Sequence, residues 1–211
     1  MEELAFQLNA YASYEDIEEN GPPSDPLMFD QASVGVAQCV ASSVYIPSTN
    51  EVVKVSNIIF EHHPDGKPPE RAYWLRRILS DCIFGVVKVC TILKFRNSPD
   101  VPWEVTEHLA AVKIMSWERI RTLRHVEDPL NEVAAMQLVS SDGVHPHVMG
   151  ALDVLQNKEA LLLFMPFCSR GRLIESVQKG SRFPEPEARY VFRQILEVCC
   201  SDMCPSFLDH C

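Results

Sequence analysis

Short apolar runs separated by polar breaks follow one another in the middle of the chain, and this pattern predicts strands. Residues 74–93 contain two such runs, WLRRILSDC and IFGVVKVCTIL. A third run, HLAAVKIM at 108–115, follows a polar, proline-bearing connection at 95–107. Residues 144–165 contain two more apolar runs on either side of an Asn-Lys turn. The pattern therefore predicts five strands.

Apolar residues at helical spacing predict a helix within residues 124–139. Its start is marked by Asp128 as N-cap, Pro129 at the first helical position and Glu132 in the first turn. Its predicted apolar side consists of Leu130, Val133, Ala134 and Leu138.

Two further helices are predicted near the end of the chain. RLIESVQKG at 172–180 is a short helix ended by Gly180, and PEPEARYVFRQILEV at 184–198 is a longer amphipathic helix. The apolar stripe of the longer helix consists of Ala188, Val191, Phe192, Ile195 and Leu196. The order of strands and helices predicts an α+β fold.

The first 70 residues differ in pattern from the rest. Residues 13–30 are rich in acidic residues, Pro and Gly, which predicts a mobile segment. Residues 43–60 have two β-branched arms around a PSTN turn and predict a β-hairpin. Residues 61–70 contain three prolines and a glycine, and they are the best candidate for a domain boundary.

The net charge of −10 is concentrated at the N-terminus. Residues 1–53 hold nine of the 29 acidic residues and no Lys or Arg, so this region is not expected to bind nucleic acid or an anionic membrane. The chain starts without a basic leader, and its longest apolar run, at 160–168, is too short to span a bilayer. We therefore expect an intracellular, cytoplasmic protein with reduced cysteines.

Lys113 lies inside an apolar strand, where a lysine either points to water or requires a partner. Glu132 follows 19 residues later on the first amphipathic helix. A strand lysine paired with a helix glutamate is an arrangement that presents an ammonium group to nucleotide phosphates. The alternative interpretation is an ordinary lysine on the polar face of the strand.

Six motifs follow one another in the chain: Leu79–Val87, Ala111–Lys113, Glu132, His145–Val148, Leu161–Leu173 and Glu187–Leu196. In this order they resemble the glycine-rich loop, A-x-K, the helix C glutamate, H-P-x-V, the fifth strand with the hinge, and helix E of a eukaryotic-type protein kinase domain of the Ser/Thr class. The resemblance implies a five-stranded, mainly antiparallel N-lobe sheet with helix C, then the hinge and only the first helices of the C-lobe. The resulting division is an acidic, partly disordered extension at 1–70, an N-lobe at 71–165, the hinge and start of the C-lobe at 166–198, and an unstructured Cys-rich tail at 199–211.

The resemblance also implies an ATP site. Its residues are Leu79, Gly85, Val87, Ala111, Lys113, Met165, Pro166 and Cys168. Lys113 corresponds to the lysine that holds the α- and β-phosphates, and Glu132 to the glutamate that positions it. Val87 and Ala111 correspond to the residues that enclose the adenine, and Met165 to the gatekeeper.

In the hinge of the resembling family, the carbonyl at the Pro166 position accepts a hydrogen bond from adenine, and the N–H at the Cys168 position donates one. Ser80 and Cys82 replace two loop glycines, and Arg172 replaces a common acidic residue. We therefore expect weaker nucleotide binding than is typical of the family.

The catalytic segments of the family, H-R-D and D-F-G, do not occur after helix E in this sequence. The chain therefore resembles a kinase domain truncated before the catalytic loop. The Mg²⁺ that the full-length family uses has no ligands here, and we expect the chain alone to be inactive.

Other interpretations stay open. One is a non-catalytic module that binds nucleotide, or a partner kinase through an exposed helix at 186–198. Another is an unrelated α+β protein in which Lys113 and Glu132 form an ordinary ion pair. Residues 35–55 also resemble a decayed glycine-loop hairpin ending near Lys54, but no helix-borne glutamate follows, so an ordinary hairpin is favoured. The cysteine spacing C-C-x3-C-x6-C in the tail does not favour a zinc site.

Overall fold

A computed structural model describes residues 29, 33–123, 125–141, 145–178 and 184–199. The predicted mobile segment at 13–30 lies outside the described residues apart from Phe29, and Gly180 lies outside them too. The predicted unstructured tail at 199–211 also lies outside them, apart from Cys199, which is the last residue of a helix.

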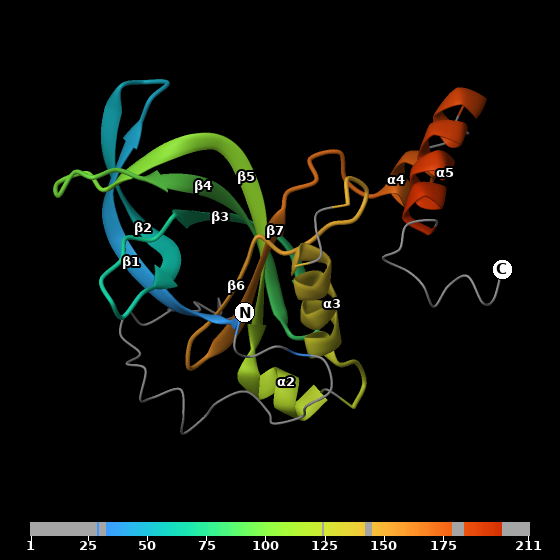
Figure 1. The fold of residues 1–211 in the computed structure, drawn as a ribbon, viewed down its shortest axis with the longest axis horizontal. Coiled ribbons are helices and arrows are strands. Elements are labelled where there is room, and N and C mark those ends of the chain that lie inside the picture. The colour runs from blue at the N-terminus through green and yellow to red at the C-terminus, as the bar shows by residue number, and fades with distance from the viewer. Residues whose placement is uncertain (1–28, 30–32, 124, 142–144, 179–183, 200–211) are drawn as a thin grey trace, which may run out of the picture.

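The described part of the chain forms a barrel of seven strands with helices at its side and end (Figure 1). The elements are β1 (Gly35–Ile46), β2 (Glu51–His62), β3 (Arg71–Cys82), β4 (Gly85–Phe95), β5 (Trp103–Ser116), α2 (Trp117–Leu123), α3 (Pro129–Ser141), β6 (Asp153–Gln156), β7 (Ala160–Pro166), α4 (Leu173–Gln178) and α5 (Glu185–Cys199). The strand order is β1-β2-β3-β4-β5-β7-β6, and β1 closes the barrel by pairing with β6 and β5.

The predicted five-stranded, mainly antiparallel sheet is confirmed. It consists of β3, β4, β5, β7 and β6, and every neighbouring pair in this series is antiparallel. Its apolar residues fill the inside of the barrel, where the ring of Tyr73 stacks on that of Phe164 with centroids 3.9 Å apart. These long-range pairings determine which residues of β4, β5 and β7 lie next to one another.

The polar connection predicted at 95–107 is wrong at its C-terminal end, because β5 begins at Trp103. Trp103 is 3% exposed and its ring packs beside those of Phe60 and Phe95, at 5.4 and 5.6 Å between centroids. Pro102 obscured the period-2 pattern of W-E-V-T-E in the sequence. The burial of Trp103 against Phe60 and Phe95 accounts for the earlier start of β5.

The N-terminal hairpin of β1 and β2 is longer than the predicted 43–60 and belongs to the same barrel as the other strands. Across the proline-rich break, Ile58 and Ile59 of β2 pair with Trp74 and Tyr73 of β3. A domain boundary at 61–70 remains a prediction, but the strands on its two sides share hydrogen bonds. Lys54 is exposed, as in an ordinary hairpin.

Helix α3 begins as predicted, because the Leu130 backbone N–H donates to Oδ1 of Asp128 at 3.0 Å and Pro129 is the first residue. Val133 is fully buried, but Leu138 is 57% exposed and does not belong to the buried side. Helix α2 was not predicted, because it follows β5 without a break. Ser116, the last residue of β5, acts as its N-cap, since its Oγ accepts the Arg119 backbone N–H at 3.4 Å. The Trp117 side chain of α2 is buried and its Nε1 donates to the Asn157 carbonyl at 3.0 Å.

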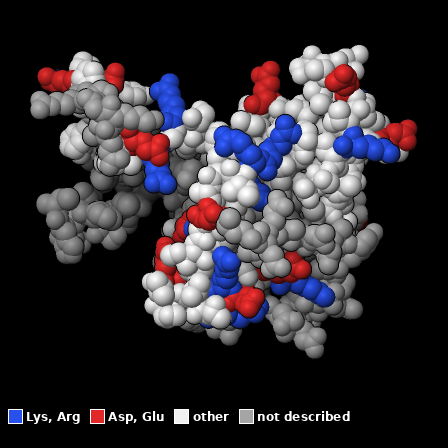
Figure 2. Space-filling model, turned by 180° about the vertical axis from the view of Figure 1, so that it is seen from behind, with Lys and Arg blue, Asp and Glu red and all other residues white. Residues whose placement is uncertain are grey.

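Helices α4 and α5 lie to one side of the barrel (Figure 1). The large apolar side chains of α5 are exposed: Tyr190, Phe192, Ile195 and Leu196 have 45 to 68% of their surface accessible. Basic and acidic side chains are interspersed on the face seen in Figure 2, in keeping with 20 acidic and 19 basic residues outside the first 53. None of the helices described has the length and apolar character needed to cross a bilayer.

Candidate nucleotide-binding site

Lys113 of β5 and Glu132 of α3 form an ion pair in which the Lys113 Nζ donates to Oε2 of Glu132. The lysine side chain is 16% exposed, whereas the glutamate side chain is 39% exposed. Glu132 lies in the first turn of α3, because Asp128 caps that turn and fixes where the helix starts. The ammonium group is therefore held in place at the edge of the core, with access to solvent on one side.

The predicted adenine-facing residues lie on the same face of the sheet as Lys113. Directly opposed residues in antiparallel strands point to the same side, and residues two apart along a strand do so as well. Val87 of β4 is opposite Lys113, and Met165 of β7 is opposite Ala111 of β5. The sheet register thus places Val87, Ala111 and Met165 around the lysine as an apolar surface.

The two predicted hinge residues follow the end of β7. Pro166 is the last residue of this strand, is paired with Ala110, and is exposed. Cys168 lies two residues further on and carries an exposed free thiol. Leu79 lies on β3 and is 37% exposed. It stands between Ile78 and Ser80, where the pairing of β3 with β4 shifts register.

Gly85 has a structural role that the sequence did not reveal. It is in register with Met115 of β5, and a Cβ atom at this position would clash with the Ile114 carbonyl oxygen. Glycine is therefore needed for the close approach of β4 to β5. The predicted phosphate loop is a two-residue turn between Cys82 and Gly85.

Phe84, at the tip of this turn, is buried with only 2% of its surface exposed. It packs in a core cluster with Met115, Trp117, Leu130 and Val133, and its carbonyl accepts the Ser116 N–H at 2.9 Å. The tip of the β3–β4 hairpin is thus fixed to the end of β5 and to the first turns of α3. Sequence reasoning missed this residue, although an aromatic residue in a predicted loop was a signal.

Asp153, at the start of β6, forms a second polar cluster that the sequence did not predict. Its Oδ2 accepts a hydrogen bond from the Tyr73 hydroxyl and lies 3.3 Å from Nε of Arg71. Burial raises the pKa of Asp153, while Tyr73 and Arg71 lower it in part. Burial and the neighbouring carboxylate also raise the pKa of Tyr73. This cluster links β3 to β6 and has a structural role.

Substituting Asp153 with alanine is expected to lower the free energy of unfolding by about 1–3 kcal/mol, because the buried Tyr73 hydroxyl loses its acceptor. The measurement is urea unfolding of the single variant. In a double-mutant cycle, Tyr73→Phe should remove most of this cost, and full additivity of the two substitutions would contradict the proposed interaction.

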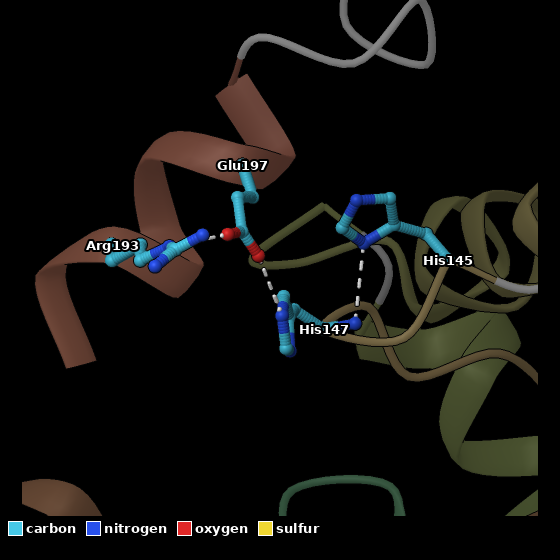
Figure 3. Close-up of polar contacts among 4 residues, drawn as sticks. All are labelled: His145, His147, Arg193 and Glu197. Atoms are coloured by element: carbon cyan, nitrogen blue, oxygen red, sulfur yellow. Dashed lines mark hydrogen bonds and ion pairs between the residues drawn. The ribbon is translucent and has the colours of Figure 1, made fainter. Parts of the chain in front are cut away.

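A polar contact joins the α3–β6 connection to α5 (Figure 3). Nε2 of His147 lies 2.9 Å from Oε2 of Glu197, whose other oxygen accepts from Nε of Arg193 at 2.9 Å. The His147 backbone N–H donates to Nδ1 of His145 at 3.2 Å. The hydrogen bond from Arg193 lowers the pKa of Glu197, and the one to His147 adds to this effect, whereas desolvation opposes it.

The depressed pKa of Glu197 predicts a pH-dependent contact. The ionised carboxylate stabilises the folded contact at pH values above the ordinary glutamate pKa of 4.5. This stabilisation is lost as the pH falls through the lower pKa of Glu197 in the folded state. We expect acidification below about pH 4.5 to shift the NMR signals of α5 amides, and Glu197→Gln to remove this response. Glu185→Gln, which breaks the Arg189 pair on the same helix, is the control and should leave the response intact.

The Lys113–Glu132 pair lies beside an apolar sheet face and a strand that ends in proline. Residues 103–199 match the family described as protein kinase domain. The relatives include "Probable serine/threonine-protein kinase fhkD" of Dictyostelium discoideum, 30% identical over 132 residues. They also include "Serine/threonine protein kinase OSK3" of Oryza sativa subsp. indica, 27% identical over 124 residues. The family match and these relatives support a eukaryotic-type protein kinase domain.

The alignments cover most of this chain but little of the relatives. The match to the Dictyostelium protein covers 61% of this chain and 15% of that protein, and the match to OSK3 covers 59% and 22%. A "Carbon catabolite-derepressing protein kinase" of Secale cereale is 28% identical over 93 residues, which is 44% of this chain and 18% of that protein. The chain thus spans less than a quarter of the length of these relatives.

Proposed function

We propose that this chain binds ATP as the nucleotide-binding part of a Ser/Thr protein kinase, whose family reaction transfers the ATP γ-phosphate to a protein hydroxyl. The observation that carries the proposal is the Lys113–Glu132 ion pair at the edge of an apolar sheet face. In this proposal the Lys113 ammonium binds the α- and β-phosphates, and Glu132 keeps it in position. The names of the relatives support the Ser/Thr class.

The adenine ring lies, in this proposal, between Val87 and Ala111, with Met165 limiting the depth of the pocket. The carbonyl of Pro166 accepts a hydrogen bond from the adenine amino group, and the N–H of Cys168 donates one. Proline has no N–H, but only its carbonyl is required here. The exposed free thiol of Cys168 also fits a reducing, intracellular location.

Magnesium accompanies ATP in this family and neutralises the charge of the phosphates. The described residues contain no group of three His, Cys, Asp or Glu side chains that could hold a metal ion. In this proposal the metal is assigned only as part of the Mg-ATP substrate, where phosphates and water supply most of its ligands.

We further propose that the 211-residue polypeptide by itself does not transfer phosphate. Neither H-R-D nor D-F-G occurs in its sequence, so it supplies no aspartate of either motif to orient the hydroxyl or to hold the metal. Incorporation of labelled phosphate into the purified chain or an added protein substrate would overturn this part of the proposal.

A thermal-shift titration with Mg-ATP tests nucleotide binding directly. A ligand at about ten times its dissociation constant stabilises the folded state by about 1.4 kcal/mol, which raises the melting temperature by about 3–6 °C for a domain of this size. Absence of a shift in a folded protein at millimolar Mg-ATP would favour the unrelated α+β interpretation.

A second candidate function is partner binding through α5. Phe192 and Ile195 are 60% and 50% exposed on this helix, and an apolar patch of this kind marks an interaction surface. Phe192→Ser combined with Ile195→Ser is expected to reduce self-association or partner capture without changing the Mg-ATP shift. Unchanged self-association and unchanged partner capture in this variant would contradict an interaction surface on α5.

A further inference from the structure

The segment before and at the start of β1 contacts α3, the helix that carries Glu132. Gln137 of α3 donates a hydrogen bond from Nε2 to the Ser33 Oγ at 2.6 Å. Phe29 and Val34 pack against the core cluster that includes Leu130 and Val133 of α3. We call Phe29, Ser33, Val34 and Gly35 the N-terminal brace.

The brace is anchored to the barrel at its C-terminal end. Gly35 and Val36 of β1 pair in parallel with Leu155 and Gln156 of β6. A Cβ atom on Gly35 would lie 2.5 Å from Oε1 of Glu61 and 2.8 Å from Cδ2 of Leu155, so the strand is closely packed at this point. The brace therefore connects α3 to a fixed part of the sheet.

A cleft borders one side of α3. A cleft of about 510 Å³ lies between this helix, the start of β1 and β6, with Ala134, Leu138 and Ser140 in its wall. Leu138 is 57% exposed beside it. The brace contacts α3 on the side where the helix borders this cleft, and these contacts add to those of Leu130 and Val133 in the core cluster.

We propose that the N-terminal brace positions α3 so that Glu132 pairs with Lys113, and that Phe29 and Ser33 are positioning residues for nucleotide binding. The inference rests on the proposed function of Lys113. It assigns a role to a segment outside residues 103–199, where the family match lies. Neither brace residue contacts the ammonium group in this proposal, since both act through α3.

The test compares the 211-residue chain with a Phe29→Ala, Ser33→Ala double variant. Amide hydrogen exchange is measured in α3 and, as an internal reference, in the buried strand β7. Binding of a fluorescent ATP analogue with Mg²⁺ is measured in parallel. The control is Val52→Ala, which removes a 54% exposed apolar side chain from the far end of the same hairpin.

The double variant is expected to exchange its α3 amides about tenfold faster, with β7 unchanged, and to bind the analogue about three- to tenfold more weakly. Unchanged α3 exchange, or equal acceleration in α3 and β7, would overturn the brace. Faster α3 exchange with unchanged affinity would overturn the positioning of Glu132. If the unsubstituted chain binds no analogue, the proposed function fails, whereas α3 exchange still decides whether the brace holds the helix.

Discussion

Substituting Lys113 with methionine is expected to lower the affinity for Mg-ATP by about 10- to 100-fold and to abolish the thermal shift. A hydrogen bond to a charged group contributes about 1.5–3 kcal/mol, and methionine keeps the apolar stem while removing the ammonium. The substitution also leaves the Glu132 carboxylate without its partner beside the phosphates, where like charges repel. The measurement is a titration with Mg-ATP followed by melting temperature and by calorimetry.

Lys94→Met is the matched control, because Lys94 is an exposed lysine on the neighbouring strand β4. It should bind Mg-ATP like the unsubstituted chain. Equal affinity in Lys113→Met would remove Lys113 from the site and leave the ion pair with Glu132 as a structural contact.

Truncating Phe84 to alanine is expected to lower the free energy of unfolding by about 3–5 kcal/mol, the usual cost of removing a buried aromatic side chain. The phenyl ring is 2% exposed and fills space between Met115, Trp117 and Val133. Because this core cluster lies beneath the first turns of α3, the variant should also weaken Mg-ATP binding. Urea unfolding followed by tryptophan fluorescence measures the loss of stability.

Ile83→Ala is the control for Phe84→Ala, since the two residues are neighbours in the same turn and Ile83 is 51% exposed. Its effect on the free energy of unfolding should stay within about 0.5 kcal/mol, as for most surface substitutions. Equal destabilisation by the two substitutions would contradict the burial of the hairpin tip.

Most of the sheet and of α3 was predictable because its signals are local. Alternating apolar runs indicated β3, β4, β6 and β7, and Asp128 with Pro129 marked the start of α3, where the Asp128 side chain does cap the first turn. The spacing of Lys113 and Glu132 led to the predicted pair, and the structure brings these two side chains together.

Other features depended on contacts between distant residues and were missed. Trp103 belongs to β5 because its ring lies between Phe60 and Phe95, which the local pattern around Pro102 does not reveal. The Trp117 side chain at the start of α2 is buried and its Nε1 donates to the Asn157 carbonyl, which the local sequence does not reveal. Leu138 matched the helical period but faces a cleft rather than the core.

The sequence by itself determined the order of the elements, the helix start at Asp128 and the candidate ion pair, because apolar periodicity, capping chemistry and the charges of individual side chains are local properties. Only the tertiary structure decided that β1 and β2 close the barrel, that Phe84 is buried and that Ser33 contacts α3 through Gln137. Strand pairing and side-chain burial depend on residues far apart in the sequence, such as Gly35 and Leu155, and their free energy arises only when the whole barrel is assembled.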